Sequence, residues 1–146
     1  RELDSHESYH LFEMGEGGNG AHVIVEHNTT LPQAQQGFGT VHHVAFRVND
    51  RSELNDWQKR LQAFNIPNSG YVERYYFGSL YARVAPHILF EFATDGPGFM
   101  EDEPYETLGE KLSLPPFLEE KREQIESIVR SIDTVRSTLT FEKEYL

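Results

Sequence analysis

The sequence contains no cysteine. This absence excludes a disulfide framework, a thiolate nucleophile and the cysteine-ligated classes of zinc and iron–sulfur site. Any metal ion in this protein must therefore be bound by histidine and carboxylate side chains. The chain has 7 histidines and 24 aspartates and glutamates, so such ligands are plentiful.

Basic residues are scarce, with 13 lysines and arginines and a formal net charge of −11. Because binding to a phosphate backbone or to anionic lipid requires positive charge, nucleic acid and acidic membrane surfaces are poor partners. No apolar run approaches the roughly 18 residues that cross a bilayer, and the N-terminal residues match neither a signal peptide nor a transit peptide. We therefore expect a soluble, cytoplasmic protein.

The composition is that of a folded domain. The chain has 146 residues, of which 38% are hydrophobic and 12% aromatic, as is ordinary for one globular domain with a sizeable core. It begins with Arg1 rather than Met, and its first thirty residues read like the middle of a longer sequence. We therefore expect a fragment or a processed product.

The two ends of the chain differ from its centre. Two β-prone runs around a glycine-rich stretch predict a hairpin within residues 1–28, and the polar residues 29–40, with Pro and Gly, predict a connector. A Pro- and Glu-rich stretch in residues 97–146 leads to a predicted helix over about 118–138. This last segment is expected to be a C-terminal extension.

Residues 41–96 predict a β-α-β-β-β module and hence an α+β fold. Asp50 is a candidate N-cap with Glu53 three positions later, and apolar residues recur at helical spacing as far as Ile66. Gly78 and Pro86 are the predicted breaks between later strands. The predicted strands are 41–48, 71–77, 79–84 and 87–94.

Strand alternation places His43 and Glu91 on the same side of the predicted sheet. Alternating apolar residues of the first and last strands must face the helix, and they are Val44, Phe46, Val48, Ile88, Phe90 and Phe92. His43 and Glu91 therefore face away, together with Tyr81 and with Arg47 and Arg83. The open face is thus predicted to collect a histidine, a glutamate, a tyrosine and two arginines.

A carboxylate between Phe90 and Phe92 is costly to bury unless a cation, a metal or hydrogen-bond donors accompany it. Imidazole and carboxylate suit divalent iron, manganese or zinc, and two histidines with one carboxylate suit iron that binds both a substrate and dioxygen. The residues supply two of these three ligands. Without a metal, His43 would be a hydrogen-bonded strand histidine, and Glu91 would form a salt bridge to Arg47 or Arg83.

Three separated stretches resemble the C-terminal part of the vicinal oxygen chelate (glyoxalase/bleomycin resistance/extradiol dioxygenase) superfamily, in its bacterial ring-cleaving dioxygenase branch. They are GTVHHVAFRV, YYFGSLYARVAPHILFEFATDGPGF and ETLGEKLSLPPFLEEKREQIE, within about residues 39–128. The resemblance implies a βαβββ module over 41–96 whose curved mixed sheet forms half of a metal-binding cleft. Residues 1–28 would then be the end of a preceding module.

The same resemblance implies roles for individual residues. His43 and Glu91 would be metal ligands, and Tyr81 would hydrogen-bond the substrate oxygen that the metal holds. The part of the family that supplies the other histidine is missing, so His42, His87, water or a second chain would have to fill its place.

The activity implied by the resemblance is cleavage of a catechol- or hydroquinone-like ring with dioxygen, on Fe(II) or else Mn(II) or Zn(II). A glyoxalase-like isomerase or lyase and a non-catalytic module that binds a small aromatic compound or antibiotic are the alternatives. An isolated half-cleft would expose apolar surface and strand edges. We therefore expect a homodimer, or association with the missing N-terminal part.

Overall fold

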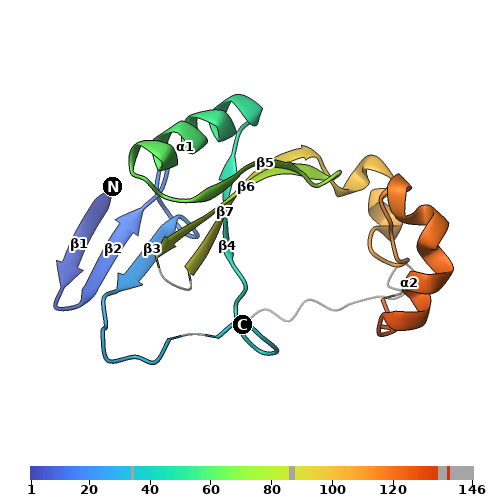
Figure 1. Cartoon of the computed structure of the whole chain (residues 1–146), viewed down its shortest axis with the longest axis horizontal. Helices are drawn as coiled ribbons and strands as arrows, with labels where there is room; N and C mark the ends of the chain where they lie inside the picture. The colour runs from blue at the N-terminus through green and yellow to red at the C-terminus, as the bar shows by residue number, and fades with distance from the viewer. Residues whose placement is uncertain (34, 86–87, 135–137, 139–146) are drawn as a thin grey trace. The chain divides into compact units, whose positions relative to one another are not determined.

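The computed structural model describes residues 1–33, 35–85, 88–134 and 138 (Figure 1). The chain divides into two compact units, residues 1–35 and 36–146. The predicted break at Pro86 and the position of His87 lie outside the described residues. No helix among the described residues is long and apolar enough to cross a membrane.

The first unit is a three-stranded antiparallel sheet in the order β1-β2-β3. Its strands are β1 (Glu2–His6), β2 (Tyr9–Glu13) and β3 (His22–Glu26). The pairing of β2 with β3 confirms the predicted hairpin. Strand β1 was not predicted, because its residues, ELDSH, are mostly polar and lack an apolar alternation.

The second unit contains the predicted β-α-β-β-β order. Its elements are β4 (Val44–Val48), α1 (Arg51–Ala63), β5 (Asn68–Glu73), β6 (Phe77–Ala85) and β7 (Ile88–Pro97). The strand order is β4-β7-β6-β5, with β4 parallel to β7 and the other pairs antiparallel. The α+β class and the mixed sheet are confirmed.

The predicted break at Gly78 is wrong, because the chain turns at residues 74–76 and Gly78 lies inside β6. A Cβ at Gly78 would lie 2.7 Å from a ring carbon of Tyr71 on the neighbouring strand β5. The glycine therefore makes room for a cross-strand aromatic ring, a role that glycine also plays within strands.

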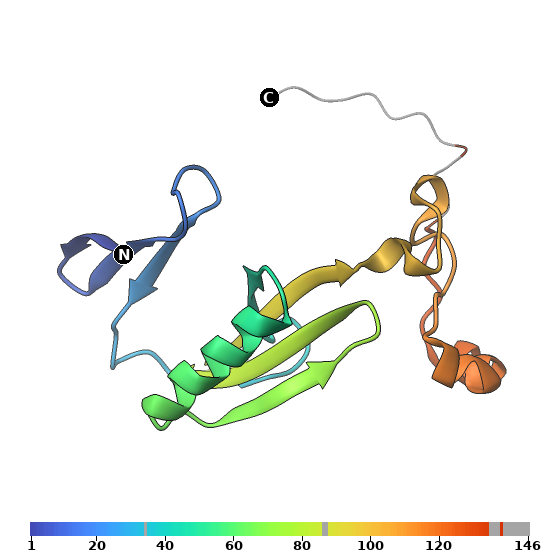
Figure 2. The ribbon, with the colours of Figure 1, turned by 90° about the horizontal axis from the view of Figure 1, so that it is seen from above.

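The core lies between α1 and one face of the sheet (Figure 2). Leu54 of α1 is only 1% exposed, and it belongs to the same buried cluster as Leu80 and Phe92. Trp57 stacks on Phe92 with ring centroids 4.6 Å apart. The apolar alternation of β6 and β7 is therefore directed toward the helix, as predicted.

The residues after β7 form short helices rather than one long helix. They are the 3-10 helices η1 (Phe99–Glu101), η2 (Tyr105–Thr107) and η3 (Pro116–Lys121), and then α2 (Arg122–Ile128). The predicted helix over 118–138 is wrong beyond Ile128, since residues 129–134 are not helical. Ile128 and Ile132 are 76% and 72% exposed. These two side chains therefore pack against no apolar surface among the described residues, so their spacing alone does not extend the helix.

The start of α1 generates a test of the fold. Asp50 accepts a hydrogen bond from the backbone N–H of Glu53 at 2.9 Å, while Glu53 accepts from the backbone N–H of Asn49 at 2.8 Å. We expect Asp50→Ala to lower the free energy of unfolding by about 1 kcal/mol, because the helix loses its N-cap. Asp56→Ala, which removes an exposed pair with Lys59, is the matched control and should change it by less than about 0.5 kcal/mol. Urea titration followed by circular dichroism measures both, and equal losses would contradict the capping role.

Candidate metal centre

Pairing of three adjacent strands brings the predicted site residues together. In the register of the sheet, Glu91 of β7 lies opposite Tyr81 of β6 on one side and Ala45 of β4 on the other. The predicted strand over 41–48 begins only at Val44, so His43 immediately precedes β4. The side-chain contacts below show that His43 nevertheless reaches Glu91, as the alternation predicted.

The Glu91 carboxylate is the centre of the site, with only 5% of its side chain exposed. Its Oε2 lies 2.7 Å from Nε2 of His43. Its Oε1 accepts hydrogen bonds from the Tyr81 hydroxyl, at 2.6 Å, and from the hydroxyl of Ser79. The two carboxylate oxygens thus have different surroundings: two hydroxyl donors hold Oε1, and Oε2 faces an imidazole nitrogen.

The salt bridge that sequence analysis held open as an alternative does not form. Arg47 pairs instead with Asp95, at 3.0 Å between Nε and Oδ1. Among the ion pairs of the described residues, Glu91 pairs with His43 and with neither Arg47 nor Arg83. Burial of the carboxylate is therefore compensated by hydroxyl and imidazole groups.

His43 has a second contact on its other ring nitrogen. Its Nδ1 lies 2.8 Å from Nδ1 of His42, so one of the two rings donates and the other accepts. The His43 ring also packs edge-on against the ring of Tyr81, with centroids 6.3 Å apart. About a third of the His43 side chain is exposed. The ring is therefore oriented on two sides while its Nε2 edge points at the carboxylate.

Sequence analysis assigned no role to two residues of this site. Ser79 is 0% exposed and donates to Glu91. Arg74 donates from Nε to the Tyr81 hydroxyl oxygen at 3.2 Å, and its guanidinium lies 5.0 Å from the centroid of the Tyr81 ring. Alternation predicts that Ser79, two positions before Tyr81, lies on the same open face, but a serine there gave no reason to assign it a role. Arg74 lies in the turn between β5 and β6, where alternation does not apply.

The donor set fits a divalent metal in part. An imidazole nitrogen and a carboxylate oxygen 2.7 Å apart are the ligand types that divalent iron, manganese and zinc accept. No group of three or more histidine, cysteine, aspartate or glutamate side chains suited to a metal occurs among the described residues. The described residues therefore bring together one imidazole and one carboxylate, which are two side chains of types that could bind such a metal.

Comparisons with known proteins agree on one family. Residues 2–100 match the sequence model of the Glyoxalase/Bleomycin resistance protein/Dioxygenase superfamily. The Bacillus subtilis protein named "Putative ring-cleaving dioxygenase MhqA" is 48% identical over 122 residues, which are 84% of this chain and 39% of that protein. The "Chlorohydroquinone/hydroquinone 1,2-dioxygenase" of Sphingobium indicum is 32% identical over 126 residues, which are 81% of this chain and 37% of that protein.

A solved structure gives the same result for the fold. The crystal structure of a protein named "putative dioxygenase" from Bacillus subtilis matches with a TM-score of 0.74 and 34% sequence identity. The match covers 100% of this chain and 44% of that one. The chain therefore spans about two fifths of the length of the relatives it matches.

The buried carboxylate generates a stability prediction. Ser79→Ala should lower the free energy of unfolding by about 1–3 kcal/mol, because a buried charged acceptor loses a donor. Ser127→Ala, which removes an exposed hydroxyl that bonds only the Gln124 carbonyl of its own helix, should stay within about 0.5 kcal/mol. In a Glu91→Gln background the cost of Ser79→Ala should shrink, since the charge is gone. An undiminished cost in that double variant, measured by urea titration, would show that Ser79 acts through packing alone.

Proposed function

Since this chain belongs to the glyoxalase/bleomycin resistance protein/dioxygenase superfamily, we propose that it is the C-terminal, metal-binding part of a ring-cleaving dioxygenase. The observation that carries the proposal is the 2.7 Å approach of His43 Nε2 to Glu91 Oε2 on the face of the sheet opposite α1. Relatives named as ring-cleaving dioxygenases support it. The proposed substrates are hydroquinone- or catechol-like aromatics, with dioxygen as the second reactant.

Membership of this superfamily, together with relatives named dioxygenases, suggests a metal cofactor. His43 and Glu91 are the residues that would hold it, and we propose Fe(II), with Mn(II) or Zn(II) as alternatives. When bound, such a metal acidifies a substrate hydroxyl and holds substrate and dioxygen next to each other. Ser79 and Tyr81 prepare the site by fixing Oε1 of Glu91, which leaves Oε2 beside His43.

Tyr81 is the proposed acid and hydrogen-bond donor to the substrate. Its hydroxyl oxygen accepts from Nε of Arg74, and its own proton is directed at Glu91 Oε1. A substrate oxygen that replaced Glu91 as the acceptor would receive this proton along an existing hydrogen-bond direction. Because Arg74 is permanently charged, it stabilises negative charge that develops on the phenol during such a transfer.

We further propose that the missing histidine ligand comes from outside the described residues. The chain covers 39% of the length of MhqA, so the rest of a longer polypeptide is the first candidate source. A second copy of the chain, or His87, is the alternative. In this arrangement residues 1–28 are the end of a preceding module, residues 29–40 a connector, residues 41–96 the module and residues 97–146 an extension.

A binding module without turnover is the second candidate function. It is favoured by the two-ligand count, since the described residues offer no group of three metal-binding side chains. Such a module would sequester an aromatic compound in the same half-cleft. Metal content distinguishes this candidate from the dioxygenase, and zinc or nickel in place of iron would favour an isomerase or lyase.

Metal content is therefore the primary test. Elemental analysis of the protein purified without chelator should find about one iron per chain, since one site of this type binds one ion. His43→Ala and Glu91→Ala should each lose it, while His6→Ala, which removes an exposed histidine of the first unit, should retain it. Protein without metal would contradict the proposal that this chain, alone or as a dimer, completes the site, and would restrict the dioxygenase proposal to the longer polypeptide. Metal retained in both site variants would contradict the ligand assignment.

Oxygen uptake tests the role of Tyr81. With hydroquinone or catechol as substrate, Tyr81→Phe should lower kcat about 10²- to 10⁴-fold, the usual contribution of a general acid. Its metal content should stay at the wild-type level, because the variant keeps both ligands. Tyr9→Phe, which alters an exposed tyrosine of the first unit, is the control and should leave kcat unchanged. Wild-type kcat in Tyr81→Phe would exclude a proton-donating role.

A further inference from the structure

The turn between β5 and β6, residues 74–76, has a strained backbone. Tyr75 has a φ of 68°, in the left-handed region that bulky side chains rarely adopt. Three hydrogen bonds hold the turn from within: Arg74 N–H to the Phe77 carbonyl, Tyr75 N–H to the Glu73 carboxylate and Tyr76 N–H to the Arg74 carbonyl. Strain of this kind persists only where the surrounding structure holds it in place.

One end of the turn contacts the candidate metal centre. Arg74 donates to the Tyr81 hydroxyl at 3.2 Å and lies over the Tyr81 ring. The same hydroxyl donates to the buried carboxylate of Glu91. Arg74 therefore contacts both the hydroxyl and the ring of Tyr81.

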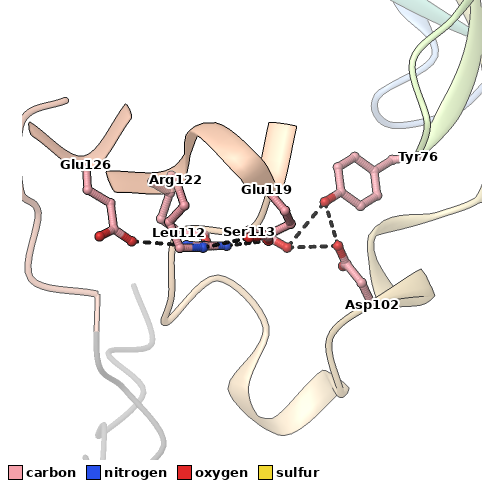
Figure 3. A network of polar contacts seen from close by, with 7 residues as sticks. All are labelled: Tyr76, Asp102, Leu112, Ser113, Glu119, Arg122 and Glu126. Carbon is pink, nitrogen blue, oxygen red and sulfur yellow. Dashed lines mark hydrogen bonds and ion pairs between the residues drawn. The ribbon is translucent and has the colours of Figure 1, made fainter. Parts of the chain in front are cut away.

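The other end of the turn contacts the C-terminal extension (Figure 3). The Tyr76 hydroxyl donates to Oδ2 of Asp102 at 2.7 Å, and the Ser113 hydroxyl donates to the same oxygen at 3.0 Å. The Tyr76 ring stacks on Phe99 with centroids 5.2 Å apart, and its carbonyl accepts from the Gly98 N–H at 2.8 Å.

The Tyr76 hydroxyl remains a donor throughout the neutral pH range. A hydrogen bond with Ser113 lowers its pKa, but burial and the Asp102 carboxylate raise it more, so the pKa lies above the usual value for tyrosine. A raised pKa means that the phenol keeps its proton at neutral pH. The bond to Asp102 is therefore a charge-assisted one, which is stronger than a bond between neutral groups.

The extension that provides Asp102 and Ser113 is itself held together by Arg122. This guanidinium bonds the Glu119 and Glu126 carboxylates and the Leu112 carbonyl, at 2.6 to 3.1 Å (Figure 3). The pKa of Glu119 is lowered by its hydrogen bonds with Arg122, which keeps this carboxylate ionised. The Leu112 carbonyl directly precedes Ser113, so Arg122 also fixes the backbone that carries the Ser113 hydroxyl.

The extension lies mostly beyond the part of the chain that the superfamily model matches, which ends at residue 100. Asp102, Ser113 and Arg122 therefore have no place in the βαβββ module and no role in the function proposed above. Their one contact with the module among the hydrogen bonds of the described residues is Tyr76. The extension thus contacts Tyr76 in the strained turn, and Arg74 in the same turn contacts Tyr81. Through this turn the extension can influence the position of Tyr81.

We propose that the C-terminal extension positions the acid of the metal centre, with Tyr76 as the positioning residue. The bond from Tyr76 to Asp102 holds the strained turn, the turn holds Arg74, and Arg74 holds the Tyr81 hydroxyl. If the bond is lost, Tyr75 can relax from its left-handed conformation and Arg74 moves off Tyr81. The inference rests on the role proposed for Tyr81.

Kinetics of single and double variants test this coupling. Tyr76→Phe keeps the ring and its stacking on Phe99 but removes the hydroxyl, and it should lower kcat about tenfold, the size of one charge-assisted hydrogen bond. KM for the aromatic substrate and metal content should stay at wild-type values. In a Tyr81→Phe background, Tyr76→Phe should have no further effect on kcat, because its influence passes through the Tyr81 hydroxyl.

Tyr105→Phe, which alters an exposed tyrosine of the same extension, is the matched control and should leave kcat unchanged. Independent losses that multiply in the Tyr76→Phe, Tyr81→Phe double variant would overturn the proposal, as would a Tyr76→Phe variant with wild-type kcat. Asp102→Asn, which retains an oxygen acceptor, should recover part of the activity that Asp102→Ala loses, and equal losses in the two would also count against it.

A readout without turnover separates this inference from the proposed function. Hydrogen exchange of the Arg74 Nε–H, followed by NMR, should be slow in the wild type and faster in Tyr76→Phe, with or without metal. If the protein shows no dioxygenase activity but this change is seen, the proposed function fails and the positioning contact stands. Unchanged exchange in Tyr76→Phe would refute the positioning contact even in an active enzyme.

Discussion

A negative charge inside a β-sheet has to be paired or hydrogen-bonded, and the Glu91 carboxylate imposes this requirement on the second unit. Its partners come from both neighbours of β7: Ser79 and Tyr81 from β6, and His43 from the residue before β4. Because one face of the sheet is taken up by the apolar contacts with α1, this polar cluster can form only on the opposite face. One face of the sheet therefore packs the apolar core against α1, and the other holds the polar cluster around the buried carboxylate.

These two faces could be predicted from the sequence, because side chains alternate between the faces of a strand and the apolar positions must face the helix. The residues between them must then lie on the opposite face. His43, Tyr81 and Glu91 were therefore found together, and Asp50 was identified as a cap from its residue type and position. Arg74 could not be found in this way, since its place depends on the left-handed conformation of Tyr75. The predicted helix over 118–138 was too long, because the spacing of Ile128 and Ile132 indicates a helix only where a partner surface exists.

The proposal of a metal site with only two ligands in the described residues is consistent with a chain that spans about two fifths of the length of its relatives. His43, just before the first strand of the module, and Glu91, on its last strand, lie together on the face that α1 does not cover, so under this proposal a further ligand would approach from that side. The N-terminal sheet, with exposed apolar residues such as Ile24 and Leu3, also has the character of a part that packs against something larger.

The parallel pairing of β4 with β7 has a consequence for the order of folding. These strands are the first and the last of the module, so their pairing closes a long loop and is among the slowest contacts to form. His43 and Glu91 meet only when that pair has formed. A partly folded chain therefore does not hold the imidazole and the carboxylate together, and a nascent chain can bring them together only after synthesis has passed β7. Since a ligand that binds only the closed form stabilises it, a metal ion held by this pair would stabilise the paired strands relative to partly folded forms.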